Sequence, residues 1–347
     1  MLKRLMVIGL ALGLILGLAG MSSAAVTVGG WLSYETSYSI WDDDAATPWD
    51  SYVRETWGSP QANHLTATYL SDDKKFGAIL QLGIADLDGG DAIWTKLANF
   101  YYDWGKGRIL FGQDYDVNEH NWPTFLTGGW SGIGIGKSYF DRNGMVKLTL
   151  GDKYKFNFAL VDPLRGDVWG GTGNVYHQLP AISMSAVLNL GNVTLTPWLR
   201  YENTLWDDGN TTDNYYTLDY GMWLHGQFGL VGFTLSVSNA VNSAQMRAIN
   251  GGNPEIVNGE VDDHIYQLNY WGELRIGGLY MGYGHTAASR DDWTEDPYTQ
   301  GVWAGYTIPY GQITFMPEVL WEDFGENNIG GDNGSVFTFG LVSSLAF

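Results

Sequence analysis

The sequence predicts an all-β fold: a transmembrane antiparallel up-and-down β-barrel of about 16 strands, with short periplasmic turns and long extracellular loops. Three observations predict it. The chain starts like an exported protein, apolar and polar residues alternate with a period of two along most of its length, and its last residues form a large apolar row. Period two is the pattern of strands, because successive side chains point to opposite faces. Strands cross a bilayer only as a closed barrel, in which every backbone group is paired.

The first residues have the features of a secretory signal peptide. Lys3 and Arg4 precede an apolar run from Leu5 to Gly20, and small residues at 23–25 suit cleavage before Val26. The run is short for a membrane-spanning helix, and alternation follows it at once. An uncleaved inner-membrane anchor is the alternative. We predict a signal peptide over residues 1–25 and one barrel domain over residues 26–347, exported through the periplasm.

The composition excludes several classes of protein. The chain of 347 residues contains no Cys, so no disulfide holds the exported protein together. Its formal net charge of −20 argues against a nucleic-acid partner, because phosphate binding needs Lys and Arg. Its 16 Trp and 21 Tyr suit a membrane barrel, in which aromatic residues form girdles at the two interfaces.

Strand-length segments alternate with turns from Val26 to the end of the chain. Short turns are predicted at residues 71–74, 105–106, 152, 191, 229, 277 and 309–310, and longer polar connections, such as 41–60, 163–179, 241–262 and 290–297, lie between the hairpins. An even number of strands puts both ends of the chain in the periplasm. The predicted strands are Val26–Ile40, His64–Leu70, Phe76–Ala85, Trp94–Trp104, Gly107–Asp114, Asn143–Gly151, Lys153–Asp162, Pro180–Leu190, Asn192–Glu202, Asn214–Phe228, Leu230–Ala240, Asp263–Ile276, Gly278–Ala287, Tyr298–Ile308, Gly311–Phe324 and Val336–Phe347.

The last segment has one large apolar face. Phe347, Leu345, Leu341 and Phe339 lie in one row, and small, mostly polar residues form the other. An ordinary terminal strand of a soluble protein is the alternative. In a closed barrel this strand must pair with the first and show lipid an apolar face, so we predict that the row is the assembly signal.

A soluble β-sandwich would show the same period, with the apolar rows filling its interior. The signal peptide, the terminal aromatic residue and the number of strands favour the barrel. A barrel of this size is too wide for its side chains to fill, so it encloses an aqueous channel.

Residues 105–115 read Gly-Lys-Gly-Arg-Ile-Leu-Phe-Gly-Gln-Asp-Tyr, a glycine turn and a strand that ends in Gly-polar-polar-Tyr. A long connection without alternation follows, and it contains Pro123, Phe125 and the pair Gly128-Gly129. Together with the architecture of the mature chain, these motifs resemble the general bacterial outer-membrane porins. The resemblance implies a barrel of about 16 strands, usually trimeric, in the outer membrane of a Gram-negative bacterium, with a third loop (about 115–142) folded inward. Gln113 departs from the family pattern, in which many members carry Arg at this position.

Such a loop would carry residues that select solutes, because a wide barrel alone passes anything smaller than its bore, and charged rings set the ion preference of a channel. Each wall Arg has a local alternative, such as pairing of Arg200 with Glu202 or of Arg275 with Glu273, and the loop acids have simple solvation as theirs. The predicted pore-constriction residues are Asp114, Asp116 and Glu119 on the loop side and Arg108, Lys147, Arg200 and Arg275 on the wall.

We therefore expect a porin, a water-filled channel for passive diffusion of ions and small hydrophilic solutes, with a preference for cations. A substrate-selective channel is the alternative, for example one for sugars that stack on the Trp residues of the loops. An outer-membrane enzyme or an adhesin barrel has less support, because no local Ser-His-acid signature stands out.

No catalytic, cofactor-binding or metal-binding residues are predicted. The acidic stretches 42–44 and 86–91 resemble fragments of calcium loops and could bind divalent cations weakly. The expected partners are outer-membrane lipid and lipopolysaccharide, small hydrophilic solutes and ions, and further copies of the chain in a homotrimer. Nucleic acid is not an expected partner.

Overall fold

The structure is a computed structural model that describes residues 25–41, 51–56, 63–84, 93–117, 142–162, 174–177, 179–207, 212–242, 255–257, 260–263, 265–289, 296–325 and 334–347. Within these ranges no helix has the length and the apolar character that crossing a membrane requires. The signal peptide predicted over 1–25 lies outside these ranges except for Ala25, the first residue of the first strand, and it stays a prediction.

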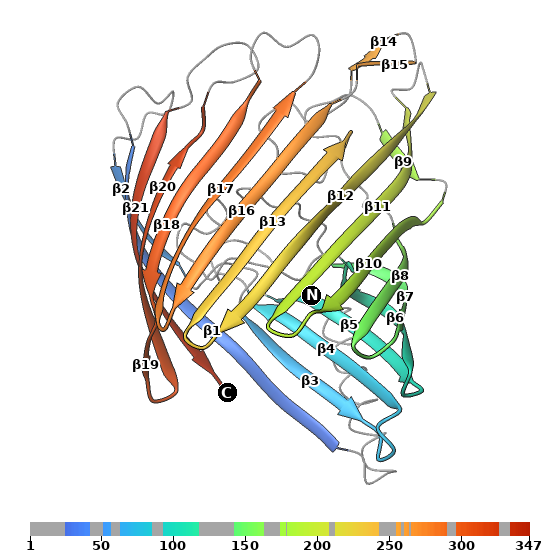
Figure 1. Cartoon of the computed structure of the whole chain (residues 1–347), viewed down its shortest axis with the longest axis horizontal. Helices are drawn as coiled ribbons and strands as arrows, with labels where there is room; N and C mark the ends of the chain where they lie inside the picture. The colour runs from blue at the N-terminus through green and yellow to red at the C-terminus, as the bar shows by residue number, and fades with distance from the viewer. Residues whose placement is uncertain are drawn as a thin grey trace.

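The described strands form a 19-stranded antiparallel sheet and a separate pair, β14 with β15. Three pairs of segments each make up one barrel strand: β2 and β3 lie along β1, β9 and β10 along β11, and β18 and β19 along β20. The barrel therefore has the predicted 16 strands (Figure 1). The strands are β1 Ala25–Trp41, β2 Ser51–Thr56, β3 His64–Leu70, β4 Phe76–Ile84, β5 Ile93–Asp103, β6 Gly107–Tyr115, β7 Arg142–Leu150, β8 Tyr154–Val161, β9 Asn174–His177, β10 Ala181–Asn189, β11 Val193–Asp207, β12 Thr212–Phe228, β13 Val231–Val241, β14 Glu255–Val257, β15 Glu260–Asp263, β16 Tyr266–Ile276, β17 Leu279–Ser289, β18 Tyr298–Tyr306, β19 Ile308–Tyr310, β20 Ile313–Asp323 and β21 Ser335–Ala346.

The barrel closes where the first strand meets the last. β1 pairs with β21 over residues 31–41 and with β3 over residues 25–31. Past the end of β21, the Gly30 N–H donates to the Phe347 carbonyl at 2.9 Å, and the Phe347 N–H donates to the Gly30 carbonyl at 3.2 Å. The closed sheet gives each described barrel strand a partner on both sides, as a membrane interior demands.

Seven short turns join strands at one end of the barrel, and the long connections lie at the other end (Figure 1). Each short turn contains a residue with positive φ, a conformation that tight hairpins need and that glycine adopts without steric penalty. The prediction that the last turn lies at 309–310 is wrong. Those residues continue the strand as β19, and the turn falls on Gly311, because proline cannot adopt positive φ. The positive-φ residues are Lys74, Gly105, Gly151, Gly191, Gly229, Gly277 and Gly311.

The two faces of the sheet have opposite character. In β16, for example, Leu268 and Leu274 are exposed on the outside, whereas Gln267, Asn269 and Glu273 are buried on the inside. Alternation along each strand repeats this division around the barrel. A soluble protein would bury the apolar face, so the arrangement suits lipid outside and a polar lumen inside.

Several predicted loops contain strands. β2 lies within the connection predicted at 41–60, β9 within 163–179 and β14 within 241–262, and β15 runs from that last connection to Asp263. β11 also continues to Asp207 instead of ending at Glu202, and there it pairs with both β9 and β12. A strand can continue beyond the apolar belt wherever a neighbouring strand still supplies hydrogen bonds. Such a segment is polar, so alternation of apolar residues does not predict it.

Replacing Phe347 by Asp should lower the yield of assembled barrel several-fold, because the Phe347 ring packs over Gly30 at the seam. A Cβ at Gly30 would come within 2.7 Å of that ring, so the glycine leaves the room that the aromatic side chain occupies. Refolding followed by heat-modifiable gel mobility measures the assembled fraction. Phe347→Leu, which keeps an apolar end, is the control and should assemble normally. A normal yield from Phe347→Asp would contradict the role of the row.

Candidate pore-lining site

The chain turns along the inner wall directly after β6. Asp116 is 0% exposed, and its Oδ2 accepts hydrogen bonds from an Arg200 guanidinium nitrogen and, at 3.0 Å, from Ser183 Oγ. Its Oδ1 accepts a hydrogen bond from the Val117 N–H at 2.6 Å. Ser183 and Arg200 belong to β10 and β11, and β7 and β8 separate these strands from β6 in the sheet. The third long connection therefore begins against the inner wall.

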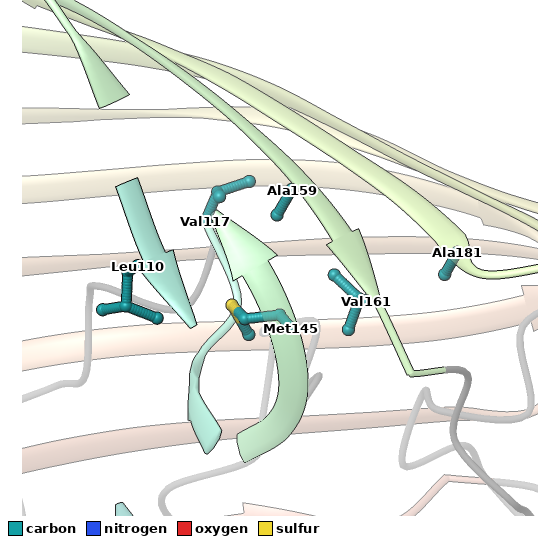
Figure 2. Packing of buried hydrophobic residues seen from close by; sticks show 6 residues of the cluster. All are labelled: Leu110, Val117, Met145, Ala159, Val161 and Ala181. Carbon is teal, nitrogen blue, oxygen red and sulfur yellow. The ribbon is translucent and has the colours of Figure 1, made fainter. Parts of the chain in front are cut away.

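Val117 fixes the same turn by packing. It is buried in an apolar cluster on the wall (Figure 2), and Ser185 Oγ donates to its carbonyl at 3.1 Å. An apolar side chain gains free energy when its neighbours remove it from water, so the cluster holds the chain against the barrel. The other members of the cluster, from β6, β7, β8 and β10, are Leu110, Met145, Ala159, Val161 and Ala181.

Arg200 lies between two carboxylates. Besides Asp116, it pairs with Glu202 on its own strand, to which Nε donates at 3.0 Å. Both partners that were considered from the sequence, a loop acid and the neighbouring Glu202, are thus in contact with the same guanidinium. With all three groups ionised the cluster carries one net negative charge, because two carboxylates face one cation. Arg200 accordingly contributes no excess positive charge to the wall.

Lys147 on β7 forms an ion pair with Asp114 on β6, and its ammonium also donates to the Tyr115 carbonyl at 3.3 Å. This pair lies on the inner face, because Lys147 is opposite the inward-facing Leu110 in the register. Glu119 lies outside the described residues. The structure therefore brings the predicted site residues together as two pairs, Asp116 with Arg200 and Asp114 with Lys147.

Arg108 and Arg275 lie near the short turns, away from Asp116. Arg108 follows the turn between β5 and β6, and its guanidinium donates to Asp103 Oδ2 at 3.1 Å and 3.2 Å. Arg275 precedes the turn between β16 and β17, and its Nε lies 3.7 Å from Glu273 Oε1, the neighbour considered from the sequence. These two cations line the mouth of the barrel at the end with the short turns.

A set of acids on the inner wall was not singled out from the sequence. The buried charged side chains of the described ranges comprise seven acids and two bases. Alternation in the sequence could have identified these acids, because Glu318 and Glu322 occupy the polar row of one predicted strand. The acids are Glu35, Asp116, Glu202, Asp219, Glu273, Glu318 and Glu322, and the bases are Lys96 and Arg200.

Neutral aromatic donors hold two of these acids. The Tyr280 hydroxyl donates to Glu318, and Trp303 Nε1 donates to Glu273 Oε2 at 3.2 Å. The Trp303 ring also lies flat over Gly282 on β17, where a Cβ would come within 2.4 Å of the indole. Hydroxyl and indole donors satisfy carboxylate oxygens without cancelling their charge. Glu273 also lies 3.7 Å from Arg275 Nε, so this side of the wall combines neutral donors with a cation.

Cofactor and metal sites were not predicted, and within the described ranges no group of three or more His, Asp or Glu side chains has a geometry that could hold a metal ion. The acidic stretches 42–44 and 86–91 lie outside those ranges, so weak divalent-cation binding there stays a prediction. The side chains of the loop Trp residues considered for sugar stacking also lie outside the described part of the structure. They are Trp41, Trp49, Trp57, Trp122, Trp130, Trp169, Trp206 and Trp293.

Comparison with solved structures shows the fold. No protein-family profile matches the chain, and no curated protein sequence matches it either. The outer membrane channel DcaP of Acinetobacter baumannii superposes with a TM-score of 0.70 at 17% identity, over 93% of this chain and 97% of that one. The anion-selective porin from Comamonas acidovorans superposes with a TM-score of 0.66 at 12% identity, over 93% of this chain and 100% of that one. A trimer form of OmpT, an outer membrane protein of Vibrio cholerae, superposes with a TM-score of 0.60 at 12% identity, over 93% of this chain and 99% of that one.

These similarities extend over nearly the whole chain, at low identity. The fold is that of the bacterial outer-membrane porins, a closed transmembrane antiparallel barrel. The resemblance to porins predicted from the sequence is therefore confirmed at the level of the fold.

Asp116→Ala should destabilise the barrel by roughly 1–3 kcal/mol, the usual cost of leaving buried hydrogen-bond donors without their acceptor, because Glu202 still opposes the charge of Arg200. The pair with Arg200 has side chains that are 1% and 0% exposed, so water cannot replace the lost carboxylate. Urea unfolding followed by Trp fluorescence measures the change.

Asp103→Ala is the matched control, because Asp103 pairs with Arg108 where both side chains are 30–45% exposed. We expect that variant to change the unfolding free energy by about 0–1 kcal/mol. Equal losses in the two variants would show that Asp116 is not fixed in a buried pair.

Proposed function

We propose that the chain is an outer-membrane porin, a water-filled channel for passive diffusion of ions and small hydrophilic solutes. One observation carries the proposal: a closed barrel of 16 strands with an apolar outer face and a polar inner face. A barrel of this size leaves a lumen that its own side chains do not fill. The apolar outer face suits the outer membrane of a Gram-negative bacterium, where lipid and lipopolysaccharide would contact it.

The proposal includes a constriction by the third long connection, residues 115–142. Its support is the placement of Asp116 and Val117, which run from the end of β6 along the inner wall to β10 and β11. A segment that starts on the inner wall is in a position to cross the lumen. Size selection in a wide barrel needs such an internal obstruction.

A preference for cations is the second part of the proposal. The support is the excess of acids among the buried charged residues of the described inner wall, seven against two bases. A lumen of one charge sign raises the local concentration of the opposite ion. Two of these acids, Glu318 and Glu273, accept hydrogen bonds from the neutral donors Tyr280 and Trp303.

A homotrimer is proposed because one of the similar structures is a trimer form and another is called a porin. Uptake of a specific substrate such as a sugar remains the second candidate among channels, and saturation of the conductance by that sugar would favour it. We propose neither enzymatic activity nor a cofactor, since the similar structures are named as channels, porins or outer membrane proteins.

The ion preference tests the position of the constriction. Replacing Asp116 by Asn together with Glu119 by Gln should reduce the preference for cations, because the permeating ion would then pass a less negative loop. The reversal potential of the refolded protein in a planar bilayer under a salt gradient measures the preference. It should move toward the value of an unselective channel.

The matched control is Asp291→Asn with Asp292→Asn, two acids of the connection between β17 and β18. In open water a charge is screened within about 8–10 Å at physiological salt, so this variant should keep the original reversal potential. A shift of equal size in both variants would contradict a constriction formed by residues 115–142. A protein that forms no channel at all would refute the porin proposal.

A further inference from the structure

A groove interrupts the lipid-facing wall on β7, β8, β10 and β11. The outward residues of these strands form two tiers across the sheet. The upper tier carries a large side chain on every strand, and the lower tier carries Ala186 where its neighbours carry Leu150 and Phe156. The missing side chain leaves a groove of about 420 Å³, which is within the range of about 300–1,000 Å³ for small-molecule sites. Its outward lining includes Leu150, Phe156, Phe158, Met184, Pro197 and Leu199.

The hydrogen-bond ladder is interrupted at the same place. The pairs of β10 with β11 run from Ile182↔Tyr201 to Ser185↔Trp198 and resume at Leu188↔Leu195 in the same register. The unpaired positions between them include Ala186 and Pro197, and proline has no N–H to donate. The small side chain and the interrupted ladder together make this part of the wall a depression in an otherwise bulky apolar surface.

A lysine lies at the edge of the groove. The turn after Leu150 contains Lys153, whose ammonium lies 5.2 Å from the centre of the Tyr154 ring. Tyr154 is outward-facing and 44% exposed, so this contact brings the charge to the lipid side of the turn. The Lys153 carbonyl accepts a hydrogen bond from Asn189 Nδ2 at 2.9 Å, and the Gly151 N–H donates to the Lys106 carbonyl at 3.0 Å, which fixes the turn between its two neighbours.

The lysines of the short turns all lie on one part of this rim. The three turns from β3 to β8 carry Lys74, Lys75, Lys106 and Lys153, with Asp72, Asp73 and Asp152 beside them. The four remaining turns, at residues 190–192, 229–230, 277–278 and 311–312, contain no ionisable side chain. In a chain with a formal net charge of −20, the groove thus opens beside turns that together carry four Lys and three Asp, one net positive charge.

We propose that the groove binds one anionic glycerophospholipid from the periplasmic leaflet of the membrane. An acyl chain fills the depression over Ala186, and Lys153 pairs with the phosphate of the headgroup. The apolar lining matches the chain, and the charge at its edge matches the phosphate at the depth where headgroups begin. This inference rests on the membrane location in the proposed function and is independent of conduction.

The test measures lipid retained by the purified barrel, using native mass spectrometry after incubation with phosphatidylglycerol or phosphatidylcholine. The wild-type chain should retain phosphatidylglycerol preferentially. Lys153→Gln should weaken that preference about fivefold, as expected for the loss of one cation near an anionic surface. Ala186→Phe fills the depression and should abolish retention of both lipids.

Two control variants separate the site from general effects. Ala304→Phe adds the same ring to an outward position of β18, and Lys75→Gln removes a positive charge from another turn that carries lysine; both should retain lipid as the wild type does. Unchanged retention in Ala186→Phe, or equal losses in all four variants, would overturn the proposal. So would a change in oligomeric state in Ala186→Phe without loss of lipid, because the groove would then be a contact between copies of the chain. Since the readout is lipid and not conductance, a protein that binds lipid but forms no channel would refute only the porin proposal.

Discussion

The structure depends on one constraint: within the apolar thickness of a bilayer, every backbone N–H and C=O needs a partner in the protein. The sheet meets it by closing on itself, with β1 paired to β21 on one side and to β2 and β3 on the other. Closure then dictates the side chains. One face of every strand must be apolar and the other is free to be polar, which is the pattern of β16 and its neighbours. The polar lumen is therefore a consequence of pairing every backbone group in a closed sheet.

The inner wall combines two ways of accommodating buried carboxylates. Around β6 to β11, cations oppose them directly, as Arg200 opposes Asp116 and Glu202. On β16 to β20, neutral donors take part: Tyr280 donates to Glu318, and Trp303 donates to Glu273, which also lies 3.7 Å from Arg275. Direct ion pairs cancel the field of a carboxylate, whereas neutral donors leave it in place. The described wall thus uses both arrangements, and its excess of buried acids over buried bases, seven to two, supports the proposed cation preference.

Most of the fold could be predicted from the sequence because its signals are local. Alternation identifies a strand from adjacent residues, and a positive-φ glycine such as Gly191 or Gly229 marks a turn within two residues. The site depends on contacts that are far apart in the chain. Asp116 and Arg200 are separated by 84 residues, and only the curvature of the sheet brings them together. Alternation placed Arg200 on the inner face, but it could not show that two acids would share it. Segments such as β2 and β9 escaped prediction because hydrogen bonds from neighbouring strands, rather than apolar alternation, define them.

The seam between β1 and β21 also determines the order in which the molecule can form. Ser39 and Thr338 hydrogen-bond across it at 2.8 Å although they are 299 positions apart in the chain, whereas most other strand pairs join consecutive strands. Contacts of such separation form slowly, because the entropy of closing the whole chain is lost before the contact is made. Until then, the edges of β1 and β21 remain available to any extended segment, including the same edges of another chain. The last pairing of the barrel is therefore both its slowest expected folding event and the moment at which it ceases to be prone to aggregation.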